Sequence, residues 1–241
     1  MKILLSAILF SFLSSGCTKQ NPMPVNQPTD TSFVEKNTTG VFTYLALGDS
    51  YTIGEAVSQN ESFPYQLKDL LVKNAVNVEA PKIIARTGWT TDELQGAIKV
   101  ANITPKYDFV TLLIGVNNQY RGYSLETYKK EFRELLETAI GFTGGKKARV
   151  FVVSIPDWGV TPFAKGGFKS AEAIAKEIDA FNAAAEKITT EAGVSFTNIT
   201  PDSRVAANDA TLIANDGLHP SGKMYSNWAN ALLPKISTVL K

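Results

Sequence analysis

The chain has 241 residues and 44% of them are hydrophobic, which is enough to bury one substantial core and too apolar for a wholly disordered chain. Its 24 basic and 23 acidic side chains nearly cancel and are scattered. This argues against a nucleic-acid partner or an anionic membrane surface, because both need a basic stripe. A single Cys and a single His exclude a disulfide framework and a zinc site built on Cys and His ligands. Any imidazole chemistry must therefore use His219.

The N-terminal segment has the features of a secretory signal. Lys2 precedes a short apolar run over residues 3–13, about half of the roughly 20 residues that a membrane-spanning helix needs. Small residues then lead to Cys17, and this junction resembles the cleavage box of bacterial lipoproteins. The resemblance implies that residues 1–16 form a signal peptide and that Cys17 is lipidated.

Residues 17–40 are expected to hold the lipid and a flexible tether. Asn, Pro, Gln and Thr dominate there and no apolar period remains. We therefore expect an exported protein that meets the membrane through its lipid only. Thr18 stands where an Asp often retains lipoproteins at the inner membrane, so the outer membrane is the expected location, and a secreted or periplasmic protein is the alternative.

Residues 41–241 are predicted to form one domain in which buried strands alternate with amphipathic helices. Five short apolar runs are typical of strands, over residues 41–47, 82–85, 109–114, 150–155 and 194–198. Apolar residues recur at helical spacing over residues 62–74, 90–101, 125–139, 174–188 and from 221 onward. A capping box of Thr90 and Glu93 begins the second helix, and Pro234 predicts a kink in the last one.

This alternation predicts an α/β fold, a three-layer α/β/α sandwich around a five-stranded parallel sheet. In such sheets, ligands bind outside the carboxyl ends of the strands. The loops after the predicted strands, and the loop before the last helix, carry the polar side chains that chemistry needs. In chain order they read Gly48-Asp49-Ser50, Arg86-Thr87-Gly88-Trp89, Gly115-Val116-Asn117-Asn118, Pro156-Asp157-Trp158 and Asp216-Gly217-Leu218-His219.

These blocks resemble those of the SGNH hydrolases, the GDSL-type esterases and lipases. That family has a Ser in a G-D-S turn, then a Gly, then an Asn in G-x-N-D/N, and finally D-x-x-H. All four occur here in this order, and the resemblance spans about residues 41–241. It implies a flavodoxin-like SGNH fold, ester hydrolysis and no cofactor or metal.

The expected catalytic residues are Ser50, His219 and Asp216. A serine hydroxyl needs a base within hydrogen-bond reach, and the base needs a partner that fixes its tautomer. In this interpretation His219 takes the proton of Ser50, and Asp216 accepts from the other ring nitrogen of His219. Asp49 is expected to hold the serine turn and not to react.

The resemblance assigns the oxyanion hole to the backbone amides of Ser50 and Gly88 and to the side-chain amide of Asn117. Asn118 stands where the family often has Asp. Each catalytic candidate has a structural alternative when taken alone, as a helix cap, a turn residue or a satisfied imidazole. These alternatives would have to coincide in family order.

Four aromatic residues lie in or near these loops: Trp89, Tyr120, Trp158 and Phe163. Each of them could line a substrate pocket, and packing in the core or at its rim is an equal alternative.

The expected function is a monomeric serine esterase that hydrolyses acyl esters, like a lipase or lysophospholipase, through an acyl-enzyme. The alternatives are a carbohydrate O-acetylesterase with the same site, or a glycan-binding surface lipoprotein without activity. A phosphate-transferring enzyme is disfavoured because Tyr51 stands where a second Asp would be needed, and no Gly-Lys-Ser/Thr of a P-loop occurs.

Overall fold

Residues 40–241, except residues 105 and 168, are described by a computed structural model. The predicted signal peptide, Cys17 and all of the tether except Gly40 lie outside the described residues. Within the described part, no helix is long and apolar enough to cross a membrane.

Five parallel strands form one sheet in the described part of the chain. They are β1 (Tyr44–Asp49), β2 (Lys82–Arg86), β3 (Phe109–Leu113), β4 (Val150–Val153) and β5 (Ser195–Thr197). Their order is β2-β1-β3-β4-β5, with every neighbouring pair parallel. This is the flavodoxin-like order of a doubly wound sheet, so the predicted fold class is confirmed. The chain changes direction across the sheet between β1 and β3, and such a switch point opens a crevice at the carboxyl ends of these two strands.

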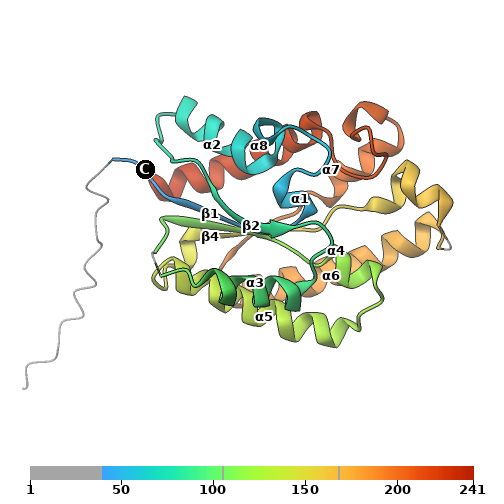
Figure 1. Cartoon of the computed structure of the whole chain (residues 1–241), viewed down its shortest axis with the longest axis horizontal. Helices are drawn as coiled ribbons and strands as arrows, with labels where there is room; N and C mark the ends of the chain where they lie inside the picture. The colour runs from blue at the N-terminus through green and yellow to red at the C-terminus, as the bar shows by residue number, and fades with distance from the viewer. Residues whose placement is uncertain (1–39, 105, 168) are drawn as a thin grey trace, which may run out of the picture. The chain divides into compact units, whose positions relative to one another are not determined.

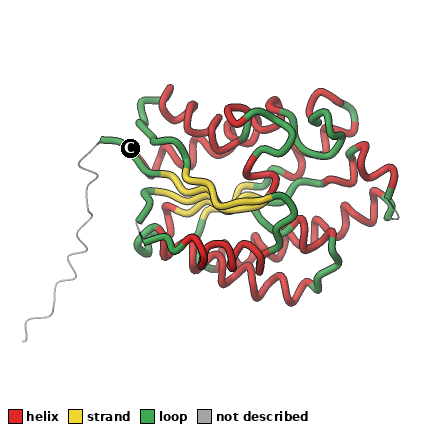
Figure 2. The backbone as a smooth tube through the Cα atoms, viewed as in Figure 1, coloured by secondary structure: helices red, strands yellow, loops and turns green. Residues whose placement is uncertain are grey.

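Helices cover both faces of the sheet (Figures 1 and 2). On one face lie α2 (Phe63–Lys73) and α8 (Gly222–Leu240), which pack on each other. On the other face lie α3 (Thr91–Ala101), α5 (Leu125–Phe142) and α6 (Ala171–Glu191).

Shorter segments complete the fold in the loops. The short α-helices are α1 (Ser50–Ile53), α4 (Val116–Tyr120) and α7 (Thr200–Arg204). The 3₁₀ segments are η1 (Gln59–Glu61), η2 (Lys147–Arg149), η3 (Trp158–Val160), η4 (Pro162–Gly166), η5 (Val205–Ala207) and η6 (Ala210–Leu212).

The first strand differs from its predicted bounds. It begins at Tyr44 instead of residue 41 and continues through Gly48 to Asp49. The apolar character of residues 41–43 suggested a strand, yet there only Phe42 makes a bridge, to Val78. Gly48 and Asp49 pair with the end of β2 although neither is apolar, because backbone pairing and not side-chain type decides where a strand ends. The strand therefore delivers Ser50 directly to the edge of the sheet.

Of two helix signals in the sequence, the capping box is confirmed and the kink at Pro234 stays a prediction. Thr90 and Glu93 form the capping box of α3, in which the Thr90 amide donates to Glu93 Oε2 at 2.9 Å. Pro234 lies inside α8, and the helix continues past it to Leu240.

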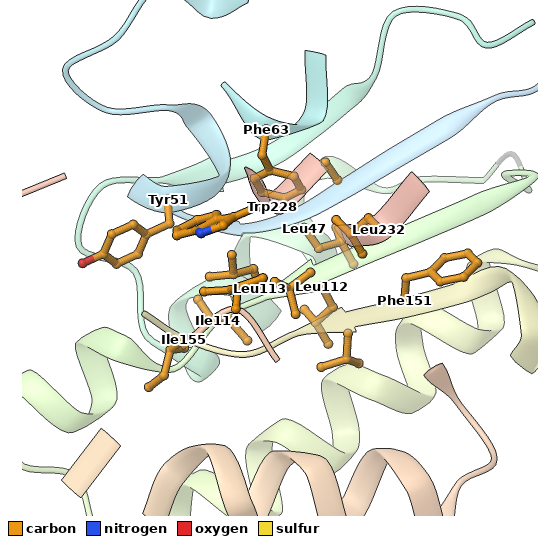
Figure 3. Close-up of a cluster of buried hydrophobic side chains, with 14 of the residues drawn as sticks. Leu47, Tyr51, Phe63, Leu112, Leu113, Ile114, Phe151, Ile155, Trp228 and Leu232 are labelled. Carbon is orange, nitrogen blue, oxygen red and sulfur yellow. The ribbon is translucent and has the colours of Figure 1, made fainter. Parts of the chain in front are cut away.

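The core beside the site is aromatic and lies between the sheet and α8 (Figure 3). Trp228 is fully buried, and its ring lies 6.3 Å from that of Tyr51 and 6.4 Å from that of Phe63. Burying a large side chain of this kind stabilises the fold by about 1.5–3 kcal/mol. Tyr51 stands at the edge of this cluster with its hydroxyl pointing away from it, and so connects the core to the loops at the end of β1.

Candidate active site

The serine turn is built by a close approach between β1 and the turn that follows it. A Cβ added to Gly48 would lie 2.1 Å from Thr52 Oγ1 and 2.3 Å from the Leu113 carbonyl oxygen, so only glycine fits there. Asp49 caps α1 by accepting from the Tyr51 amide at 3.0 Å, the structural role expected of it. Ser50 is thereby held as the first residue of α1, and it is 4% exposed.

His219 and Asp216 are in direct contact. His219 Nδ1 lies 2.5 Å from Asp216 Oδ2, and the other carboxylate oxygen accepts from the backbone amides of Leu218 and His219, each at 3.0 Å. Burial opposes the ionisation of Asp216, but these hydrogen bonds outweigh it and hold the pKa of the carboxyl below its ordinary value. A charged carboxylate on Nδ1 favours the tautomer with its proton on Nδ1 and leaves Nε2 as the proton acceptor of the ring.

The loop that carries His219 is fixed at both ends. Ile213 and Pro220 form an antiparallel bridge, and the Ala214 amide donates to the His219 carbonyl oxygen at 2.8 Å. The His219 ring packs on Tyr51 with 5.5 Å between centroids, and only 7% of the residue is exposed. Because Tyr51 follows Ser50 in the chain, this contact brings the histidine loop to the serine turn.

Gly88 and Asn117 lie beside Ser50 and His219, and all four line one cavity of about 150 Å³. Asn117 Nδ2 donates to the Trp89 carbonyl oxygen at 3.0 Å. A side-chain amide has two N–H groups, so this bond orients the amide and leaves the second N–H for a ligand. The loops after β1, β2 and β3 and the loop before α8 thus meet at the carboxyl edge of the sheet, where the switch point predicts a ligand.

Asn118 ties two of these segments together. Its Nδ2 donates to Thr91 Oγ1 at 2.7 Å and its Oδ1 accepts from the Thr91 amide at 3.1 Å, with the side chain fully buried. An amide can donate and accept at once, which an ionised carboxylate cannot do. Asn118 therefore locks α4, which carries Asn117, to the start of α3.

A comparison with family models matches residues 46–226 to the GDSL-like lipase/acylhydrolase family, about three quarters of the chain. The chain belongs to this family. Its members are ester-hydrolysing enzymes, and the match includes Ser50, Gly88, Asn117, Asp216 and His219 within its bounds. None of the curated proteins compared with the chain matches it.

Solved structures share the fold of this GDSL-like protein at low sequence identity. TesA superposes with a TM-score of 0.63 at 16% identity, covering 82% of this chain and 99% of TesA. Axe2, an acetylxylan esterase from Geobacillus stearothermophilus, gives 0.63 at 18% identity, with 81% and 94% covered. The psychrotrophic esterase EstA from Pseudoalteromonas sp. gives 0.58 at 17% identity, with 82% and 97% covered.

The aromatic residues predicted near the site separate into two groups. Tyr120, Trp158 and Phe163 line the cavity beside Ser50. Trp89 is not among its lining residues; it packs against the core and lines a separate hollow along β2 and α3. Of the two interpretations left open for these side chains, Trp89 takes the packing one.

Trp158 is oriented by a chain of polar contacts that the sequence did not indicate. Its Nε1 donates to Gln119 Oε1 at 2.8 Å, and Gln119 Nε2 donates to Glu177 Oε2 at 2.6 Å. Lys169 Nζ pairs with the same carboxylate at 2.7 Å. Hydrogen bonds from Lys169 and Gln119 outweigh the effect of burial and lower the pKa of Glu177. The indole is thereby fixed in the wall of the cavity.

Arg121 is a further residue that the motifs missed. Its Nη2 donates to the Gly88 carbonyl oxygen at 2.5 Å, and its Nη1 pairs with Glu93 at 3.1 Å. On the other side of the same loop, Thr87 Oγ1 donates to Glu55. Gly88 has φ +85°, a left-handed conformation that glycine adopts without strain. These contacts hold the Gly88 loop against the site.

Asp49 also differs from an ordinary surface carboxylate. It is fully buried, and among the described residues its Oδ2 has no hydrogen-bond partner. Burial raises the pKa of Asp49 to about 8, despite the opposing hydrogen bond from the Tyr51 amide. The carboxyl that precedes the candidate nucleophile in the chain therefore favours its neutral form more strongly than an ordinary aspartate does.

Proposed function

We propose that the chain is a serine esterase that hydrolyses carboxylic esters through an acyl-enzyme on Ser50. The main support is that Ser50, His219, Gly88 and Asn117 line one cavity. In addition, Asp216 is hydrogen-bonded to Nδ1 of the His219 imidazole. This is the set of groups that acyl transfer requires, namely a nucleophile, a base with an oriented ring and donors for an oxyanion.

In the first half of the proposed reaction, His219 removes the proton of Ser50 Oγ as the oxygen attacks the ester carbonyl carbon. The negative charge moves to the carbonyl oxygen, where the amides of Ser50 and Gly88 and the side chain of Asn117 donate hydrogen bonds to it. Donors placed in advance at that position are worth about 10²–10³ in rate each. The tetrahedral adduct then expels the alkoxide, which receives the proton from His219.

In the second half, water attacks the acyl-Ser50 carbonyl carbon and gives its proton to His219. The second tetrahedral adduct collapses, the carboxylic acid leaves, and Ser50 Oγ recovers its proton. Asp216 keeps the imidazole in the required tautomer and stabilises the imidazolium that forms twice in the cycle. Lipid acyl esters and O-acetylated glycans both fit this chemistry, because the reaction steps involve only the ester group that both substrates contain.

A substitution of the nucleophile tests the proposal. Ser50→Ala should abolish hydrolysis of a panel of p-nitrophenyl esters while the circular dichroism spectrum and the melting temperature stay close to those of the wild type. A control at a half-buried serine that does not line the cavity, Ser226→Ala on α8, should keep its activity. Activity retained in Ser50→Ala would reject Ser50 as the nucleophile.

We also propose that the protein is exported and lipid-anchored in the cell envelope through Cys17, after removal of residues 1–16. The apolar run and the Ser-Gly-Cys junction in the sequence support this. The full chain expressed in a bacterial host with labelled palmitate should give a labelled, membrane-bound product, and Cys17→Ser should give neither. An unlabelled, freely released wild-type product would reject the lipid anchor and show that residues 1–16 act as an ordinary secretory signal.

A further inference from the structure

The aromatic wall beside Ser50 has a second side. Tyr120, Trp158 and Phe163, which line the inner cavity, also line an outer cavity of about 540 Å³ together with Gly166, Gly167 and Lys169. One set of rings therefore lines two neighbouring cavities, and of these two only the inner one is lined by Ser50 and His219. An ester bound with its carbonyl at Ser50 would place one of its two halves along the outer space.

The wall leaves large aromatic surfaces in water. Tyr120 is 55% exposed and Phe163 is 45% exposed, and they are the two aromatics among the exposed large hydrophobic residues of the described chain. Their ring centroids lie 6.3 Å apart, and each meets Trp158 in an edge-on arrangement at 5.4 and 6.1 Å. Exposed apolar surface gathered in one place marks a binding surface.

The inner cavity limits the acid half of the ester. Its volume of about 150 Å³ equals that of an engineered apolar cavity in another protein that takes up benzene. The ester carbonyl and its oxyanion already occupy part of this space. The inner cavity therefore suits an acyl group of only a few carbons, and the outer cavity falls to the alcohol half.

Lys169 is the charged group among the described residues that line the outer cavity. Besides the three rings, these residues are Gly166, Gly167 and Lys169, and Lys169 pairs with Glu177. An aliphatic chain that covered this ion pair and the glycine peptide groups would remove their hydration. A sugar ring offers C–H groups to the aromatic faces and hydroxyl groups to Lys169 and the peptide groups, so it matches both kinds of lining group.

From this geometry we infer that the outer cavity is a binding site for the sugar residue of a short-chain acyl ester, with the ring packed on Phe163 and Tyr120. This inference rests on the proposed esterase activity for the orientation of the bound ester, since the position of the ester carbonyl at Ser50 decides which half of the ester lies in the outer cavity. The binding surface itself is independent of the reaction.

Phe163→Ala tests the site with little disturbance of the loop that carries Asp216 and His219. The contact of Phe163 with that loop is a hydrogen bond from its backbone amide to the Gly217 carbonyl oxygen at 3.0 Å, which alanine keeps. Val205→Ala is the matched control, because Val205 is a similarly exposed apolar side chain, at 49%, on η5 outside both cavities. The substrates are two acetate esters with the same acyl group, a monoacetylated methyl xylopyranoside and ethyl acetate.

We expect Phe163→Ala to lower kcat/KM for the acetylated xyloside about tenfold more than for ethyl acetate, mainly through KM. Val205→Ala should leave the ratio of the two substrates unchanged. An equal loss with both substrates, or none, would overturn the sugar site. A selective loss on p-nitrophenyl octanoate relative to p-nitrophenyl acetate would also overturn it, because the outer cavity would then hold the acyl chain.

Calorimetric titration with unacetylated xylotriose separates this inference from the proposed function. Wild type and Val205→Ala should bind the trisaccharide, and Phe163→Ala should bind it about tenfold more weakly. Binding with this pattern in a protein that hydrolyses no ester would keep the sugar site and reject the esterase. Ester hydrolysis without any binding of xylotriose would keep the esterase and reject the sugar site.

Discussion

Replacing the buried carboxyl of Asp49 by an amide should change how the stability of the protein depends on pH. Asp49→Asn keeps the shape of the side chain and the acceptor for the Tyr51 amide, and it removes the proton equilibrium. In the folded state the carboxyl has a pKa of about 8, compared with 3.8 for the free group. Between these two values the folded protein holds a proton that the unfolded chain has released.

The sign and the size of the effect follow from this difference. A state that binds more protons is destabilised as pH rises, so Asp49 makes the folded protein less stable with each step from about pH 4 to pH 8. A difference of one bound proton between the two states changes the free energy of unfolding by about 1.4 kcal/mol per pH unit, or about 2.7 kcal/mol between pH 5 and pH 7. The free energy of unfolding of Asp49→Asn, relative to the wild type, should therefore rise by this amount over that range.

Urea unfolding of both proteins at pH 5, 6 and 7 measures the difference directly. Glu137→Gln makes the same carboxyl-to-amide exchange at an exposed position on α5, and its free energy of unfolding should follow that of the wild type over this pH range. If wild type and Asp49→Asn changed in parallel with pH, Asp49 would carry its charge in the folded state and the account of its burial would be wrong.

Substitutions at three further residues test the roles of single groups. Asn117→Ala should lower kcat by about two to three orders of magnitude with little change in KM, because its amide acts on the transition state; a raised KM at constant kcat would make it a substrate-binding residue. Asp216→Asn should lower kcat by up to about four orders of magnitude at unchanged fold, since the amide favours the other tautomer of His219; near-normal activity would contradict that role. Arg121→Ala should lower kcat about tenfold because the Gly88 loop loses its hydrogen bond, and it should change stability little because the ion pair is exposed. Arg121→Lys should recover part of the rate. A lowered melting temperature with normal kcat would make Arg121 purely structural.

The sequence predicted the layers of the fold because its strands are buried on both faces. Runs such as residues 109–114 and 150–155 have no polar alternation, which is typical of a parallel sheet between helices. The predicted start of β1 was wrong because residues 41–43 are as apolar as a strand, but the β-pairing there is an isolated bridge from Phe42 to Val78 and not a continuous ladder. Strand bounds depend on pairing, and pairing is a property of two segments.

The candidate site was predictable where it rests on short motifs and not where it rests on distant pairs. The spacing of Asp216 and His219 placed both on one loop, and the structure brings them to 2.5 Å. The bond from Arg121 to Gly88 joins residues 33 positions apart, and no pattern in the sequence marks it. The orientation of Trp158 by Gln119 is likewise a contact between two segments, η3 and α4, that lie apart in the chain.

Covalent labelling of the nucleophile tests the central claim most directly. An organophosphate that mimics the acyl transfer step should react once per molecule, and peptide mapping by mass spectrometry should place the adduct on Ser50, with loss of activity in proportion to labelling. His219→Ala should slow this labelling strongly, because Ser50 then lacks its base. An adduct on a different serine, or full esterase activity in a protein completely labelled at Ser50, would contradict the assignment of Ser50 and His219 as the reacting pair.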